Sequence, residues 1–150
     1  MEKTARITGC GEFLERHPYD LSGGERQRAA LAALIMTKPK ILLLDEPTKG
    51  LDAAYKKELA DILKSLCSDG ATVIAVSHDI EFCAEYADIC ALVFAGSAAA
   101  CGEAREFFAG NSFYTTAANR ISRRFFKNAV TNDEVVYLCR KQKENTDGAR

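Results

Sequence analysis

The sequence has no Gly-x-x-x-x-Gly-Lys-Ser/Thr loop anywhere in its 150 residues, and so it lacks the usual cradle for the phosphates of a nucleotide. Its apolar runs, such as the one at residues 89–95, are far shorter than the roughly 20 residues that cross a bilayer. The first residues form no apolar targeting core. The sequence therefore predicts neither a membrane-spanning helix nor a self-sufficient nucleotide site.

Charge and cysteine usage exclude further classes of function. With 20 basic and 21 acidic residues, the formal net charge is -1, and no overall field draws the chain to nucleic acid or to an anionic membrane. The six cysteines include no Cys-x-x-Cys pair, which disfavours structural zinc and favours reduced thiols in the cytosol. We expect a cytoplasmic protein with no nucleic-acid partner.

Helical and strand signals alternate from residue 22 to about residue 110, a pattern that predicts an α/β fold with a mainly parallel sheet in one layered domain. Residues 41–44 are a continuous apolar run, typical of a strand that is covered on both faces, and residues 72–76 are predicted to be another buried strand. Two shorter strands, at residues 89–94 and 98–101, are expected to form a hairpin because glycines bracket the second one.

The predicted helices have clear start and stop signals. Ser22 and Glu25 have the spacing of a capping box, and Pro39 stops the helix that they begin. The apolar stripe of this helix is expected to consist of Ala30, Leu31, Leu34 and Ile35. A second helix follows Asp52 and ends near Gly70.

After Gly110 the pattern becomes helical. We expect a helix around residues 113–125 and another from Thr131, where Thr131 and Glu134 repeat the capping-box spacing. Residues 111–142 are therefore predicted to be a helical C-terminal extension, and residues 143–150 a flexible tail.

A candidate anion site lies at the start of the first helix, where Ser22, Gly23 and Gly24 precede Glu25. Helix N-termini present unpaired backbone N–H groups and a positive dipole end, and glycine allows a phosphate to come close. An ordinary capped helix after a turn is the simpler reading of Ser-Gly-Gly alone. The motifs that follow in the chain favour the nucleotide-binding reading.

Asp45 and Glu46 stand at the C-terminal end of a predicted central strand, the edge at which open α/β sheets bind ligands. Asp45 is suited to hold Mg²⁺ through water, and Glu46 to polarise a water aimed at a phosphoryl group. His78 follows the next strand, so strand polarity places it at the same edge as Glu46. In isolation each of these motifs would have a purely structural explanation.

Together the motifs resemble the ATP-binding cassette (ABC) family over residues 15–110. Residues 21–25 resemble the signature motif, residues 41–45 the Walker B strand, and residues 48–52 the D-loop that ends at Asp52. By this resemblance Glu46 is the catalytic base, His78 is the switch histidine, and ATP and Mg²⁺ are the cofactors. The family also implies a head-to-tail dimer, in which the signature of one ABC ATPase domain covers ATP held by the other.

The family's Walker A loop and Q-loop should lie before Ser22, where only some twenty residues are present. Residues 1–110 therefore resemble the C-terminal half of an ABC ATPase domain, a partial P-loop NTPase. Such a half needs a Walker A loop from an N-terminal cassette half, from a separate polypeptide or from a partner cassette.

The tail, at residues 107–120 and 128–131, resembles cassettes of energy-coupling-factor transporters. That resemblance implies an ATPase subunit that couples hydrolysis to uptake of a small solute such as a vitamin or a metal ion. Its partner would be a transmembrane subunit, which holds it peripherally on the cytoplasmic face of the cell membrane.

Three alternatives remain open on the sequence alone. The chain resembles, less closely, the C-terminal lobe of a DNA-repair or chromosome-maintenance ATPase, although no heptad run precedes Ser22. It could be a non-hydrolytic partner whose surface around the signature motif, residues 21–25, completes the site of another ATPase. A truncated or mis-started gene product with no independent role is the third alternative.

Overall fold

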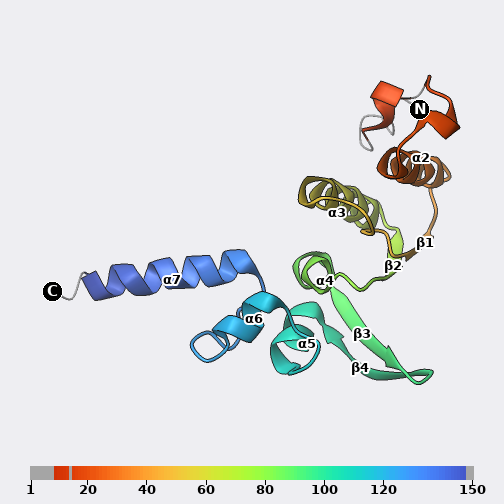
Figure 1. Cartoon of the computed structure of the whole chain (residues 1–150). Coiled ribbons are helices and arrows are strands. Elements are labelled where there is room, and N and C mark those ends of the chain that lie inside the picture. Colours follow the sequence, from red (N-terminus) through yellow and green to blue (C-terminus); the bar gives the residue numbers. More distant parts are fainter. Residues whose placement is uncertain (1–8, 14, 148–150) are drawn as a thin grey trace. The chain divides into compact units, whose positions relative to one another are not determined.

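The structure is a computed structural model that describes residues 9–13 and 15–147 (Figure 1). The chain forms two compact units, Met1–His78 and Asp79–Arg150. The boundary between cassette half and extension that the sequence predicts at residues 110 and 111 stays a prediction.

The first unit is built around a parallel strand pair. Strand β1 (Ile41–Asp45) pairs with β2 (Thr72–Val76), with Ile41 opposite Thr72 and Asp45 opposite Val76. The helix α3 (Ala53–Ser68) connects the two strands, and α2 (Gly23–Met36) precedes them. Two short 3-10 helices come first among the described residues, η1 (Cys10–Phe13) and η2 (Pro18–Asp20). The predicted parallel α/β arrangement is confirmed.

The predicted helix boundaries of this unit are also confirmed. The Ser22 N–H donates to the Glu25 carboxylate over 2.7 Å, and the Glu25 N–H donates to the Ser22 hydroxyl over 3.3 Å, so the capping box is complete. After α2, Lys38 has a φ of 48° and precedes Pro39, which cannot continue a helix. After α3, Gly70 has a φ of 92°, a left-handed conformation that favours glycine.

The expected burial of the two strands on both faces is wrong. Leu42 is 4% exposed, whereas Leu43 beside it is 70% exposed. The side chains that share the exposed face are each at least 53% exposed, namely Ile41, Leu43, Ile74 and Val76. Successive side chains of a strand point to opposite faces, and the described residues cover only one of these faces.

The stripe predicted for α2 is only partly buried. Leu31 is buried and Ile35 is half-buried, but Ala30 and Leu34 are exposed. In α3, by contrast, Leu59, Ala60, Ile62 and Leu63 are all buried. The core of the first unit therefore lies between α3 and the covered face of the strands.

The second unit contains a hairpin and four helices among its described residues. Strands β3 (Ile89–Phe94) and β4 (Ser97–Glu103) pair in antiparallel fashion, as the sequence predicts. Ala95 and Gly96 link them with φ values of 49° and 78°, the positive angles that tight hairpin turns require. The helices are α4 (Ile80–Tyr86), α5 (Ala104–Gly110), α6 (Ala117–Ser122) and α7 (Asn132–Asp147).

Three helices of this unit differ from the prediction. The seven residues of α5 are too few for a periodic signal, and this helix was not expected. The helix α6 starts later than residue 113, because the Asn111 side chain accepts hydrogen bonds from the Phe113 and Tyr114 N–H groups and forms a turn. Residues 143–147, predicted to be part of a flexible tail, continue α7, since they follow a run of good helix formers. Residues 148–150 lie outside the described residues.

A buried polar network holds α6 in place. Asn119 is fully buried, and its side-chain amide donates to the Lys127 and Ala129 carbonyl oxygens. The Thr115 hydroxyl donates to the Phe108 carbonyl over 2.6 Å, and the Thr116 hydroxyl donates to the Val130 carbonyl over the same distance. The buried side chains of Thr115, Thr116 and Asn119 thus each have a partner, as buried polar groups require.

Glu134 fixes the start of α7. Its carboxylate accepts hydrogen bonds from the Val130 and Thr131 N–H groups and pairs with Arg105 of α5. The Glu134 N–H donates to the Thr131 hydroxyl, so this predicted capping box is confirmed as well. Burial raises the pKa of Glu134, but the two backbone N–H groups and Arg105 outweigh it and bring the pKa below the ordinary value of 4.5.

Because the pKa of Glu134 is lowered in the folded protein, its stabilising effect is present above about pH 4.5 and is lost as the pH falls through the folded-state pKa. We expect Glu134→Gln to destabilise the start of α7 by about 1 kcal/mol at pH 7, and by progressively less in acid. Amide hydrogen exchange at Val130 and Thr131 measures this. Glu144→Gln, an exposed position on the same helix, is the matched control. An undiminished effect at pH 3 would contradict the prediction.

Candidate functional site

Glu46 and His78 meet at the carboxyl edge of the parallel strands. Glu46 follows β1 directly, and its N–H donates to the Val76 carbonyl at the end of β2 over 2.8 Å. One Glu46 carboxylate oxygen, Oε2, accepts from the His78 N–H over 3.3 Å, and the other, Oε1, lies 3.5 Å from His78 Nε2. The structure thus brings together the two residues that the sequence predicts to be catalytic.

Glu46 has two features that are common at functional sites. Its φ is 48°, a left-handed conformation that costs a non-glycine residue on the order of 1–3 kcal/mol. Its Oε1 atom is buried and makes no hydrogen bond, although His78 Nε2 lies 3.5 Å away. A buried carboxylate oxygen without a hydrogen-bond donor is free to accept a hydrogen bond from a water molecule or a ligand.

Asp45, the predicted Mg²⁺ residue, ends β1 and is exposed next to Glu46. Within residues 9–13 and 15–147, no group of three or more His, Cys, Asp or Glu side chains is arranged to hold a metal. Protein Mg²⁺ sites commonly use one or two carboxylates together with waters and substrate phosphates. The exposed Asp45 carboxylate therefore fits a shared Mg²⁺ site and not a closed metal cage.

Contacts that the sequence did not predict support this edge. The Gln27 side-chain amide of α2 donates to the Pro47 carbonyl, directly after Glu46. Thr48 is buried, and its hydroxyl lies 3.5 Å from the Ser77 hydroxyl, next to His78. Thr48 is part of the predicted D-loop, residues 48–52, but neither it nor Gln27 belongs to a periodic pattern that would indicate these contacts.

The start of α2 forms a second candidate site. Ser22 and Gly23 are exposed, and the N–H groups of Gly23 and Gly24 have no acceptor among the described residues. Free N–H groups at a helix N-terminus are suited to bind an anion. Within the described residues, no hydrogen bond or ion pair joins this helix start to Glu46 or His78. The predicted nucleotide-binding residues, at positions 22–25, thus form one group, and the predicted catalytic residues Glu46 and His78 form another.

Glu25 holds the helix start in shape. Its carboxylate accepts from the Ser22 N–H and pairs with Arg16 over 3.0 Å. The backbone and hydroxyl of Ser22, with a contribution from Arg16, lower the pKa of Glu25 despite the opposing effect of burial. An ionised carboxylate repels phosphate, so the donors that the structure offers to a nucleotide are the Gly23 and Gly24 N–H groups. Direct contact of Glu25 with a nucleotide stays a prediction.

Asp52, the predicted D-loop residue, caps α3 by accepting a hydrogen bond from the Tyr55 N–H over 3.0 Å. The Arg28 guanidinium lies over the Tyr55 ring, 4.3 Å from its centroid, and so joins α2 to α3. Asp52 is exposed, so its side chain can cap α3 and remain accessible to another domain. Its part in coupling two ATPase domains stays a prediction.

Comparison with known proteins points to one family. A family model described as "ABC transporter" matches residues 1–49. A putative ABC transporter ATP-binding protein of Bacillus thuringiensis is 45% identical over 125 residues, which are 83% of this chain and 23% of the relative. The energy-coupling factor transporter ATP-binding protein EcfA2 of Streptococcus agalactiae is 38% identical over 71% of this chain and 39% of its own length. The chain thus spans less than half the length of these relatives.

Solved structures agree with this result. The structure of cbiO1 from Clostridium perfringens, described as part of the ABC transporter complex cbiONQ, has a TM-score of 0.66 and 28% identity, and the match covers 83% of this chain and 48% of cbiO1. A dimeric ATP-binding cassette, MJ0796, bound to ADP and phosphate has a TM-score of 0.63 and 28% identity, over 69% of this chain and 45% of its own.

The parallel α/β unit has a fold similar to that of ATP-binding cassettes, which are P-loop NTPases. The chain belongs to the ATP-binding cassette family. That it corresponds to the part of a cassette with the signature motif and the Walker B strand stays a prediction. No helix among the described residues is long and apolar enough to span a membrane.

Proposed function

We propose that this chain provides the signature face, the catalytic carboxylate and the switch histidine of an ABC ATPase that drives uptake of a small solute, such as a vitamin or a metal ion. The pairing of Glu46 with His78 at the ends of two parallel strands carries the proposal. The names of EcfA2 and cbiO1 support the uptake reading.

The described residues fit Mg-ATP. Bound Mg-ATP supplies the phosphoryl group and neutralises charge on it. Glu46 Oε1, which makes no hydrogen bond in the structure, accepts a hydrogen bond from the attacking water and takes its proton. His78 orients the Glu46 carboxylate through its N–H, and its exposed ring is free to contact the phosphate. Asp45 would hold the metal, and the Gly23 and Gly24 N–H groups would bind the phosphate of a second site.

Two separate sites in one chain imply a partner for each. The signature face would cover ATP held by a second ABC ATPase domain in a head-to-tail dimer, and the Glu46 site needs a Walker A loop. The dimeric MJ0796 structure supports the first partner. A transmembrane subunit that holds the ATPase at the cytoplasmic face is the third proposed partner, in keeping with the description of cbiO1 as part of a transporter complex.

The alternatives are less well supported. The named relatives are ATP-binding proteins of transporters, so the reading as a DNA-repair or chromosome-maintenance ATPase is not favoured. A non-hydrolytic partner would need only the signature face. The strained backbone of Glu46 and its contact with His78 favour a hydrolytic site.

The affinity of the 150-residue polypeptide for Mg-ATP tests the division into two sites. Two or three charge-assisted hydrogen bonds from the start of α2 contribute roughly 1.5–3 kcal/mol each. Micromolar affinity corresponds to a net binding free energy of about 8 kcal/mol. The contacts must supply this in addition to the cost of association, which is roughly 4–15 kcal/mol. We therefore expect titration calorimetry to show no micromolar binding, and turnover to appear only when a Walker A segment of a related cassette is fused or added. Micromolar binding by the polypeptide alone would overturn this proposal.

A further inference from the structure

The second unit has a marked separation of charge along the chain. No Lys or Arg occurs between Lys64 and Arg105, whereas residues 107–132 contain four basic residues and no Asp or Glu. For a chain with a net charge of -1, this is a strong local asymmetry. Balanced totals therefore conceal two surfaces of opposite sign.

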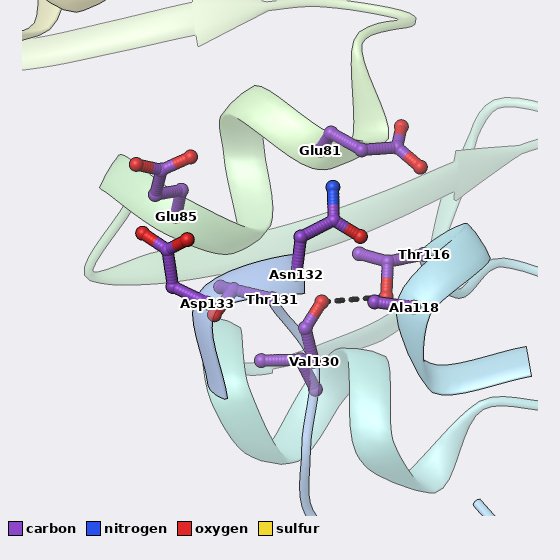
Figure 2. Close-up of a pocket in the computed structure, with 8 residues that line it drawn as sticks. All are labelled: Glu81, Glu85, Thr116, Ala118, Val130, Thr131, Asn132 and Asp133. Atoms are coloured by element: carbon purple, nitrogen blue, oxygen red, sulfur yellow. Dashed lines mark hydrogen bonds between the residues drawn. The ribbon is translucent and has the colours of Figure 1, made fainter. Parts of the chain in front are cut away.

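The acidic group lies at the start of α6. Glu81 of α4 accepts a hydrogen bond from the Ala117 N–H, the first residue of α6. Glu81, Glu85 and Asp133 line a cavity of about 230 Å³ together with Thr116, which caps α6 (Figure 2). All three carboxylates belong to exposed residues. We call Glu81, Glu85 and Asp133 the acidic end.

The basic group lies at the other end of the same helix. Residues 120–127 are anchored by the buried Ser122 and the half-buried Phe126, and the remaining six residues are exposed. Four of those six are the cations Arg120, Arg123, Arg124 and Lys127. The other two are Ile121 and Phe125, each 80% exposed. We call these six residues the basic end.

The cations of the basic end are not used inside the described chain, where none of their side chains forms an ion pair. An anion at a helix start and a cation at its end would stabilise α6 through its dipole, which is the simplest account of their placement. That effect uses one or two charges. It does not explain four cations, nor two large apolar side chains exposed between them, a combination that is typical of a contact surface.

From this arrangement we propose that the second unit binds a second copy of this chain, with the acidic end of each copy against the basic end of the other. The six residues of α6 span about 9 Å at 1.5 Å per residue, so the two ends are neighbouring patches of opposite sign. A two-fold axis that sets two α6 helices antiparallel makes both contacts at once, and Ile121 and Phe125 become buried between them. This contact involves neither nucleotide site, and it goes beyond the proposed function.

Charge reversal at both ends gives a decisive test. Glu85→Arg with Asp133→Arg makes both ends positive, and Arg123→Glu with Arg124→Glu and Lys127→Glu makes both ends negative. None of these five side chains makes a hydrogen bond or ion pair within the described residues, so both variants are expected to fold, as circular dichroism would show. Each variant alone should self-associate at least about tenfold more weakly than the wild-type chain, whereas an equimolar mixture should restore association, because both contacts are then between opposite charges.

The measurement is fluorescence anisotropy of one labelled variant titrated with the other, in low salt and without nucleotide. Each variant is co-expressed with the N-terminal half of a related cassette, so that aggregation through the exposed face of β1 and β2 does not contribute. The mixed association should weaken in 0.5 M salt because exposed charge pairs are screened. Glu58→Arg with Asp61→Arg on α3 changes the net charge equally and should not substitute for the acidic-end variant. Absence of binding between the two reversed variants, or equal binding by the α3 control, would overturn the proposal. Since no ATP is present, neither result bears on the proposed ATPase function.

Discussion

Replacement of Glu46 by Gln, in a cassette completed by a Walker A segment, is expected to lower ATP hydrolysis by about 10²–10⁴-fold while ATP binding is retained. The amide keeps the shape of the side chain but cannot take a proton from water. The Glu46 Oε1 atom, buried and without a hydrogen bond, is the group that this substitution removes from the chemistry. Single-turnover hydrolysis measured beside nucleotide binding separates the two effects.

Two further variants sharpen this expectation. Glu58→Gln, an exposed position on α3, makes the same chemical change away from the site and should leave hydrolysis unchanged. Asp45→Asn should raise the Mg²⁺ concentration needed for half-maximal rate, because Asp45 is the proposed metal residue. Wild-type turnover by the Glu46→Gln variant would remove Glu46 from the catalytic step and leave it a structural residue that is held by His78.

The features that sequence predicted correctly depend on short stretches of chain. The capping box of Ser22 and Glu25 needs only four residues, and both of its hydrogen bonds are present. The meeting of Glu46 with His78 follows from strand polarity, since parallel neighbours end at the same edge of a sheet. The Ala95-Gly96 turn between two apolar runs is likewise a local signal.

The features that sequence did not predict depend on contacts between distant segments. Gln27 supports the Pro47 carbonyl from another helix, and no pattern around Gln27 indicates this. The start of α6 is determined by the side chain of Asn111 and by the buried network around Asn119, not by helical periodicity. The exposure of Leu43 could not be predicted either, because an apolar run does not show what covers each of its faces.

The exposed face of β1 and β2 leads to the last prediction, a comparison of two adjacent leucines. Leu42→Ala in the 150-residue polypeptide should lower the free energy of unfolding by about 2–5 kcal/mol, because Leu42 is 4% exposed and its removal leaves a cavity. Leu43→Ala should cost less than about 1 kcal/mol, because Leu43 is already 70% exposed. Urea denaturation followed by circular dichroism measures both changes.

The same pair of variants tests whether another segment covers this face. The two-stranded sheet of β1 and β2 exposes four apolar side chains on one face, and its edges are open, which favours association with other chains. We therefore expect the polypeptide alone to be aggregation-prone. Co-expression with the N-terminal half of a related cassette should rescue it. In that complex Leu43 should become buried, and Leu43→Ala should then cost nearly as much as Leu42→Ala. If Leu43→Ala remained harmless in the complex, the N-terminal half would not lie on this face, and the strands would be stable with one side open to solvent.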